Sequence, residues 1–220
     1  MEGSVTLQVK DSIGTIEFYH PQSNSLPSSI LEKLSKTIKE CGNNNDIKVI
    51  ILKSKGDRVF CAGASFDELA SISNFDEGKS FFMGFANVIN ACRKCQKLII
   101  CRVQGKAVGG GVGMACAGDY CFATKFSSIK LSELAVGIGP FVVGPAVERK
   151  SGLSAFSTLS INATKWFSAD WAREQGIYSE IFESNDEMDK EINLLANKLV
   201  KSNPEAIKKL KEVFWSKTSH

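Results

Sequence analysis

The centre of the chain carries the segment Gln104-Gly105-Lys106-Ala107-Val108-Gly109-Gly110-Gly111-Val112-Gly113-Met114-Ala115-Cys116-Ala117-Gly118-Asp119, which gives the clearest indication of its architecture. An apolar run at residues 98–103 comes directly before it and is typical of a buried strand. The small residues that follow predict a tight glycine turn and then a short helix. Because such side chains allow close approach of the backbone, the turn is also a candidate ligand site.

The segments on both sides of this centre alternate between strand and helix patterns. Polar and apolar residues alternate on either side of Asp11-Ser12, which predicts a hairpin of residues 5–10 and 13–19. Other apolar runs predict strands at 47–53, 120–123, 129–131 and 177–182. Proline, glycine and serine signals predict helices at 27–41, 66–71, 75–96, 169–175, 185–201 and 204–215. This order is typical of the α/β class, with a mixed sheet covered by helices.

Composition limits the class of protein and its surroundings. The 27 basic and 24 acidic residues are spread along the chain and leave a net charge of +3, so no block indicates binding to nucleic acid or a membrane surface. The N-terminus lacks the basic and apolar segments of a signal peptide, and we expect a cytoplasmic protein. No apolar run approaches the roughly 20 residues of a membrane span.

Seven cysteines, an odd number that lies mostly in apolar stretches, suit a reducing compartment. Cys92 and Cys95 form a C-x-x-C pair that could bind a metal or change redox state. No second pair at zinc spacing accompanies them, and the pattern around them is helical. We therefore interpret them as two thiols on a helix and predict no metal site.

Two glycine-containing turns are candidates for binding an anion. Backbone N–H groups at the start of a helix can stabilise negative charge on a carbonyl oxygen, and Gly109, Gly110 and Gly111 open such a helix. The loop Val59-Phe60-Cys61-Ala62-Gly63-Ala64-Ser65-Phe66 offers a second set of N–H groups. Both turns could converge on one oxygen, although each could equally be a tight turn without a ligand.

Glu133 is the candidate acid or base. It lies between a short predicted strand and a glycine-proline loop, with Leu131, Leu134, Ala135 and Val136 as apolar neighbours. Burial among them would raise its pKa towards working pH, as general acid–base catalysis requires. An exposed loop carboxylate or a helix cap is the alternative interpretation.

Several motifs, taken in order and spacing, resemble the enoyl-CoA hydratase/isomerase (crotonase) superfamily. They are Asn24-Ser25-Leu26, Phe60-Cys61-Ala62-Gly63-Ala64, Val108-Gly109-Gly110-Gly111 with its small-residue helix, and Ser132-Glu133-Leu134-Ala135-Val136-Gly137-Ile138. The resemblance implies a ClpP/crotonase-like spiral of ββα units with a C-terminal helical region. Residues 1–183 would form the catalytic core, and residues 184–220 a helical segment for oligomerisation or for a lid.

The resemblance also implies roles for individual residues. The N–H groups of Ala64 and Gly110 would form an oxyanion hole for a thioester carbonyl, and Glu133 would face the α, β and γ carbons. Coenzyme A would enter as part of the substrate, with no permanently bound cofactor, although an acyl carrier protein is a possible alternative carrier. A homotrimer or hexamer working in fatty acid metabolism is expected. Further substrate-binding positions would be Leu26, Ala62, Ser65, Phe66, Gly109, Gly113 and Phe141.

Departures from the family pattern bear on the reaction. Hydratases of the family usually carry a second glutamate at the position of Gly113, so the resemblance favours double-bond isomerisation with Glu133 as the single acid/base. The bulky pair Phe141-Val142 after Gly139-Pro140 also resembles isomerases, and a glutamate at 113 is expected to add hydration. Hydration or decarboxylation of a branched thioester such as 3-methylglutaconyl-CoA is a competing prediction. Ser65 replaces a common aspartate, with no role assigned, and Arg58 is either a surface residue or close to the nucleotide phosphates.

Three other classes of protein compete with this interpretation. Glu133 falls 20 residues after Gly113, as in dinucleotide-binding units, but the glycine spacing is G-G-G-x-G rather than G-x-G-x-x-G. A serine hydrolase would need Ser65 or Ser132 beside a histidine, and only His20 and His220 are present. A non-catalytic relative that binds an acyl thioester or builds an assembly stays open, because one expected carboxylate is missing.

Overall fold

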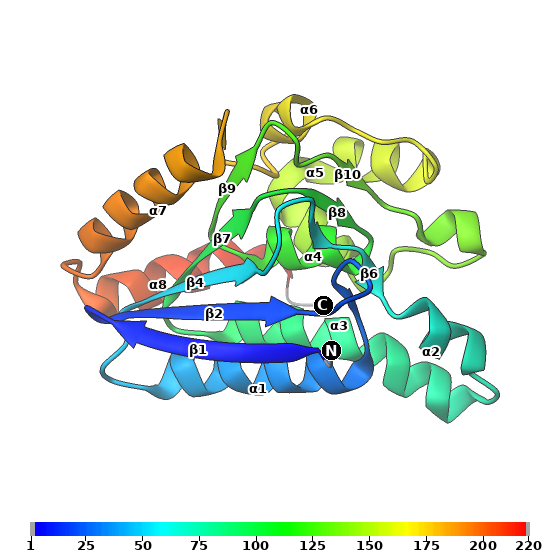
Figure 1. Cartoon of the computed structure of the whole chain (residues 1–220), viewed down its shortest axis with the longest axis horizontal. Helices are drawn as coiled ribbons and strands as arrows, with labels where there is room; N and C mark the ends of the chain where they lie inside the picture. The colour runs from blue at the N-terminus through cyan, green and yellow to red at the C-terminus, as the bar shows by residue number, and fades with distance from the viewer. Residues whose placement is uncertain (1–2, 219–220) are drawn as a thin grey trace.

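The main sheet begins with the predicted hairpin. In the computed structural model, which describes residues 3–218, β1 (Ser4–Lys10) pairs antiparallel with β2 (Ile13–Tyr19). Asp11 and Ser12 form the loop with φ of 50° and 61°, the positive values that match the twist of a hairpin. The sheet continues in the order β1-β2-β4-β7-β9-β11, and every pairing after β2 is parallel (Figure 1).

Most predicted elements are present with small shifts at their ends. The other strands are β3 (Ser25–Leu26), β4 (Val49–Ser54), β5 (Val59–Cys61), β6 (Gly63–Ala64), β7 (Leu98–Val103), β8 (Lys106–Val108), β9 (Tyr120–Thr124), β10 (Ile129–Lys130) and β11 (Glu180–Phe182). The helices are α1 (Ser28–Asn43), α2 (Phe66–Ser71), α3 (Phe75–Lys94), α4 (Gly110–Ala117), α5 (Gly144–Ile161), α6 (Ala169–Glu174), α7 (Asn185–Leu199) and α8 (Pro204–Trp215), with short 3-10 turns η1 (Glu133–Val136) and η2 (Ser216–Thr218). None of the helices within residues 3–218 is long and apolar enough to cross a membrane.

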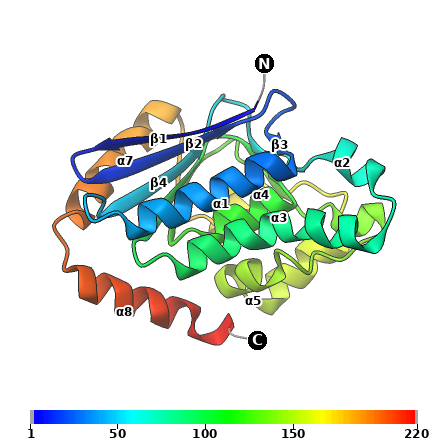
Figure 2. The ribbon, with the colours of Figure 1, turned by 90° about the horizontal axis from the view of Figure 1, so that it is seen from below.

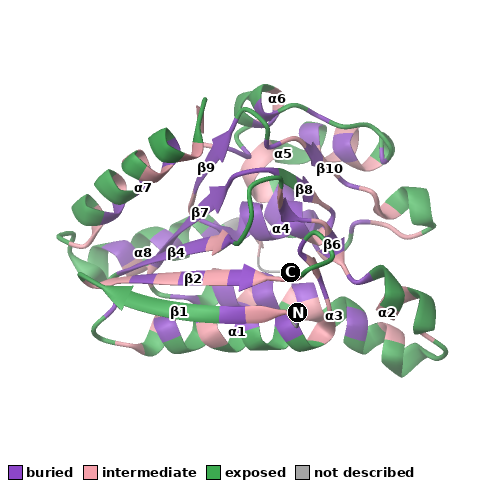
Figure 3. Ribbon diagram, in the orientation of Figure 1, coloured by how far each residue is buried: buried purple, intermediate pink, exposed green. Residues whose placement is uncertain are grey.

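The two faces of the main sheet are covered by different helices. Side chains alternate along β4, so that Val49 and Ile51 pack in one apolar cluster with Met188 of α7. Ile50 and Leu52 point the other way into the larger core, which also contains residues of α1, α3 and α4. Figure 2 shows α1 and α3 side by side below the sheet, and Figure 3 shows that α4 is buried along nearly its whole length.

Two smaller sheets position the ends of the main strands. Strand β8 lies between β10 and β5, and β3 pairs in parallel with β6. Residues 59–64 were predicted as a loop, and β5 and β6 correct that prediction. These strands have three and two residues, so they are too short to produce a periodic pattern in the sequence.

The two C-terminal helices pack on the rest of the chain. Helix α7 buries Met188, Ile192 and Ala196 against the sheet. Helix α8 buries Ile207, Lys211 and Trp215, and the Lys211 ammonium group lies 2.9 Å from a carboxylate oxygen of Asp119. The buried faces of both helices thus have partners within this chain.

All seven cysteines are free and buried, as small hydrophobic side chains would be. Cys92 lies within α3 and Cys95 caps its C-terminus. Within the described part of the chain, no group of three or more His, Cys, Asp or Glu residues could hold a metal ion.

Candidate active site

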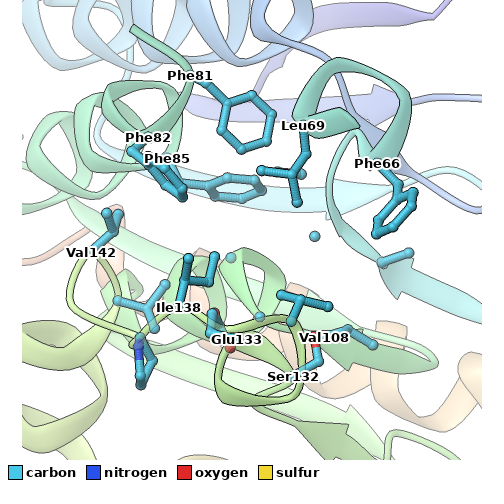
Figure 4. Close-up of a pocket in the computed structure, with 18 of the residues that line it drawn as sticks. Phe66, Leu69, Phe81, Phe82, Phe85, Val108, Ser132, Glu133, Ile138 and Val142 are labelled. Atoms are coloured by element: carbon cyan, nitrogen blue, oxygen red, sulfur yellow. The ribbon is translucent and has the colours of Figure 1, made fainter. Parts of the chain in front are cut away.

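One pocket brings together the two glycine turns and Glu133. It has a volume of about 220 Å³ and lies between α2 and α3 on one side and the segment from β10 to the start of α5 on the other. Figure 4 shows Phe81, Phe85 and Leu69 facing Ile138, Glu133 and Val142 across it. Its lining residues are Ser25, Ala62, Gly63, Ala64, Phe66, Leu69, Phe81, Phe82, Phe85, Val108, Gly109, Gly110, Ser132, Glu133, Val136, Ile138, Gly139, Pro140, Val142 and Val143.

The glycine turn presents the N-terminus of α4 to this pocket. Gly109 caps the helix at φ 53°, a left-handed conformation that strains residues with a side chain. Gly110 is the first residue of α4, where N–H groups have no partner inside the helix. A methyl group on Gly111 would lie 2.5 Å from the Cys61 carbonyl oxygen, so only glycine allows β5 to approach this closely.

The second turn lies directly against the first. A methyl group on Gly63 would lie 3.1 Å from the Val108 oxygen and 3.9 Å from the Gly110 nitrogen. Ala64 follows Gly63 and lines the same pocket as Gly110. The Ser25 hydroxyl donates a hydrogen bond of 3.0 Å to the Ala64 carbonyl oxygen and so holds this strand in place. The fold therefore brings together the two turns that the sequence indicated, 46 positions apart.

Glu133 is the titratable side chain of the pocket lining. It is the first residue of η1, and its Oε1 would lie 3.0 Å from a methyl group on Gly109. Its Oε2 is buried and has no hydrogen-bond partner within residues 3–218. Burial raises the pKa of Glu133 above its ordinary value of 4.5, because an apolar environment disfavours the charged form. The carboxyl group therefore has the environment of a proton carrier.

The wall opposite Glu133 is aromatic and was not predicted from the sequence. Phe81 and Phe85 lie one helical turn apart on α3, and both are buried. Phe82, on the same helix, packs edge-on against Phe81 with ring centroids 5.3 Å apart. In the sequence, only the aromatic residues at 81, 82 and 85 could have indicated this wall. They do not distinguish a pocket wall from the protein core, because the same stripe of α3 continues into Val88, which is a core residue.

Of the remaining predicted substrate-binding residues, the structure places some in the pocket and others elsewhere. Ala62, Phe66 and Gly109 line it. Leu26 is fully buried in the core, because alternation along β3 turns its neighbour Ser25 towards the pocket instead. Ser65 caps α2, and its hydroxyl accepts a hydrogen bond from the Glu68 nitrogen at 3.3 Å.

Gly113 and Phe141 also lie outside the pocket lining. A methyl group on Gly113 would be 2.4 Å from Cγ1 of Val143, so another side chain already fills that space. Phe141 is 84% exposed, and its ring lies against Gly139. The residues after it, Val142 and Val143, line the pocket in its place.

The structure does not bring together the serine and histidine residues that a serine hydrolase would need. The Ser65 hydroxyl is the α2 cap, and Ser132 lines the pocket, whose lining within residues 3–218 contains no histidine. His20 directly follows β2, and its backbone nitrogen donates to Asn24 Oδ1. His220 lies outside the described residues. Arg58 is exposed, and its carbonyl oxygen accepts a hydrogen bond from the Lys106 nitrogen.

Comparison with known proteins agrees with this geometry. The family model for enoyl-CoA hydratase/isomerase matches residues 8–220. A short-chain-enoyl-CoA hydratase from Clostridium acetobutylicum is 28% identical over 213 residues, which cover 95% of this chain and 80% of that protein. A peroxisomal Delta(3,5)-Delta(2,4)-dienoyl-CoA isomerase from Arabidopsis thaliana is 29% identical over 205 residues, 86% of this chain and 72% of that one.

Solved structures show the same fold. The crystal structure of an enoyl-CoA hydratase/isomerase from Marinobacter aquaeolei superposes with a TM-score of 0.87 at 23% sequence identity, covering 94% of this chain and 81% of that chain. The fold is thus the one that the motifs predicted. The chain belongs to the enoyl-CoA hydratase/isomerase family and has the crotonase fold.

Proposed function

We propose that the protein moves the double bond of an enoyl thioester, with Glu133 as the single acid/base. One observation carries the proposal: among the side chains that line the pocket, only that of Glu133 can titrate. Its unpartnered Oε2 and raised pKa suit a group that alternately takes up and releases a proton.

The reaction follows from the positions of three groups. The N–H groups of Ala64 and Gly110 would hold the thioester carbonyl oxygen at the positive end of α4. The Glu133 carboxylate would remove a proton from the α carbon of a 3-enoyl thioester. The electron pair moves onto the carbonyl oxygen and gives a dienolate. Return of the same proton to the γ carbon leaves the double bond between the α and β carbons, with no change in composition.

The surroundings of Gly113 favour isomerisation over hydration. A second carboxylate would be needed there to activate water in the family's two-glutamate mechanism. Val143 lies 2.4 Å and Ile89 3.2 Å from the place that a β carbon would take. The space is thus closed by apolar side chains, so a carboxylate that could activate water has no room at this position.

Other features of the proposal do not depend on the pocket. The substrate is an acyl-CoA, with an acyl carrier protein as the alternative carrier of the thioester. We also propose a homotrimer or hexamer that works in the cytoplasm in fatty acid metabolism.

Product analysis tests the reaction. The purified protein is incubated with 3-enoyl, 2-enoyl and 3-methylglutaconyl thioesters of coenzyme A, and products are identified by mass spectrometry in H₂O and D₂O. We expect 2-enoyl product from the 3-enoyl substrate, with deuterium incorporated at the α or γ carbon. A mass gain of one water would instead indicate hydration, and loss of CO₂ from the 3-methylglutaconyl thioester would indicate decarboxylation. Binding without product or exchange would favour a non-catalytic acyl-thioester-binding protein.

A further inference from the structure

We infer that the pocket selects short hydrocarbon acyl groups without a second charge, and that Phe85 sets this limit by closing the buried side of the pocket. The inference rests on the proposed function, since it names the acyl group that the same site accepts. It is carried by the packing of α3 against α4 and by the chemistry of the lining residues.

Phe85 takes the space that Gly110 leaves open. A methyl group on Gly110 would lie 2.6 Å from two carbons of the Phe85 ring and 2.7 Å from a third on the opposite side of the ring, so the face of the ring lies directly against Gly110. Phe85 is only 5% exposed. On its other side α3 is held close to α1, because a methyl group on Gly84 would lie 2.8 Å from Leu31. The Phe85 ring thus lies between α4 and a helix backbone that is itself packed closely against α1.

Val143 closes the neighbouring part of the buried side. It is 2% exposed, and it fills the space beside Gly113 together with Ile89, one turn beyond Phe85 on α3. The exposed lining residues Phe66 and Val136 lie at the mouth instead. An acyl chain that enters from the mouth therefore meets packed side chains at Phe85 and Val143.

The volume sets the length of the chain. An apolar protein cavity of about 150 Å³ holds one benzene molecule, or roughly six carbon atoms. The pocket here has about 220 Å³, part of which the thioester group must occupy. We therefore expect acyl groups of about four to eight carbons to fit without rearrangement.

The charge of the lining excludes dicarboxylic acyl groups. Lysine, arginine and histidine are absent from the side chains that line the pocket, and its one ionisable group is an acid. A second carboxylate on the substrate would be buried without a partner, which costs desolvation free energy. It would also lie near Glu133, and two like charges at close range repel each other.

The test measures selectivity in four proteins. Kinetics with 3-enoyl-CoA substrates of six and ten carbons give kcat/KM for the parent, for Phe85→Leu and for Phe85→Ala. The milder Phe85→Leu keeps the test decisive if Phe85→Ala does not fold. Phe75→Leu is the matched control, because Phe75 lies on the same helix, is 82% exposed and is not part of the lining. Calorimetry with the saturated hexanoyl-, decanoyl- and glutaryl-CoA thioesters measures binding independently of turnover.

We expect the parent and the control to prefer six carbons over ten by at least about 10-fold, the effect of misfit by one or two methylene groups in a closed pocket. Phe85→Leu and Phe85→Ala should reduce or reverse this preference, and glutaryl-CoA should bind at least about 10-fold more weakly than hexanoyl-CoA. Equal preference for both lengths in the parent, or an unchanged preference in folded Phe85 variants, would overturn the inference while leaving isomerisation intact. Selective binding without any turnover would support the inference and overturn the proposed reaction.

Discussion

Two carboxylates lie at opposite ends of α4, and their surroundings differ. Asp119 follows the C-terminus of the helix, and its Oδ2 accepts from the Ile99 nitrogen at 2.8 Å and from the Lys211 ammonium group at 2.9 Å. Glu133 lies beside Gly109 at the N-terminus. One oxygen of each carboxylate, Oδ1 of Asp119 and Oε2 of Glu133, has no partner within the described chain, so the two differ in the cation that only Asp119 contacts. Both side chains are largely removed from water, yet only the charge of Asp119 is balanced by a neighbouring cation.

The difference has an electrostatic reason. The C-terminal end of a helix carries partial negative charge, which disfavours a carboxylate there. Cations offset this at Asp119: Lys150 donates to its carbonyl oxygen at 3.1 Å, and Arg149 donates to Gly118 at 3.2 Å. The N-terminal end favours negative charge, so Glu133 can ionise without a cation beside it. A paired buried carboxylate therefore indicates structure here, whereas the unpaired one at the pocket indicates chemistry.

The largest expected effect is the loss of catalysis in Glu133→Gln. The amide keeps the shape of the side chain but cannot accept the proton, so kcat should fall about 100- to 10,000-fold, while binding of the thioester is largely kept. Isomerase assays at saturating substrate measure the loss. Glu148→Gln, which changes an exposed carboxylate of α5, is the control. Similar activity in Glu133→Gln and the parent would remove Glu133 from the mechanism.

At the other end of α4, a substitution beside Asp119 is expected to reduce stability and not catalysis. Lys211→Met leaves Asp119 buried without its ion-pair partner and should lower the free energy of unfolding by about 3–5 kcal/mol. Urea denaturation measures it, with Lys209→Met on the exposed face of α8 as the control. Adding Asp119→Asn to Lys211→Met should recover part of the loss, since no unpaired charge then remains. If folded Lys211→Met lost as much catalytic activity as Glu133→Gln, the assignment of a structural role to Asp119 and a catalytic role to Glu133 would be wrong.

A change within α4 tests the missing second carboxylate. The sequence predicts that Gly113→Glu adds hydration, whereas in the structure the new side chain would collide with Val143. We expect the single variant to lose about 1–3 kcal/mol of stability without gaining hydratase activity. Gly113→Glu combined with Val143→Gly opens the space and should yield 3-hydroxyacyl product. Val143→Gly alone is the control, and hydration by the single Gly113→Glu variant would argue against the steric account.

The smallest effect concerns pH. Burial raises the pKa of Glu133, so the folded protein binds its proton more tightly than the unfolded chain does. This stabilising contribution is present below the ordinary value of 4.5 and is lost as pH rises through the raised pKa. Glu133→Gln should therefore melt about 2 °C above the parent at pH 8 and at the same temperature near pH 4. In the parent, kcat/KM should rise with pH through the same interval, since the base must be ionised.

Local patterns predicted the elements that depend on neighbouring residues. The hairpin loop at Asp11-Ser12, the strand β7 and the helix α2 have the bounds or the form that alternation and capping indicated. Strands β5 and β6 were missed, because two or three residues pair only when β8 and β3 lie beside them. The same limit applies to the site. Leu26 was predicted to line the pocket, but it lies in the core and its neighbour Ser25 lines the pocket instead. Successive side chains of a strand point to opposite faces, so an error of one residue assigns a side chain to the wrong face.

The sequence alone specifies the family, the glycine turn at the start of α4 and Glu133 as the carboxylate to examine, because these depend on residue types in a fixed order. It shows at Gly110 and Gly113 only that a side chain is missing. The tertiary structure decides what occupies those spaces, Phe85 in one case and Val143 in the other. Protein interiors are close-packed, so the space beside a glycine is filled by whichever distant segment reaches it. The shape of the pocket, and with it the reaction and the acyl group we propose, follows from that packing.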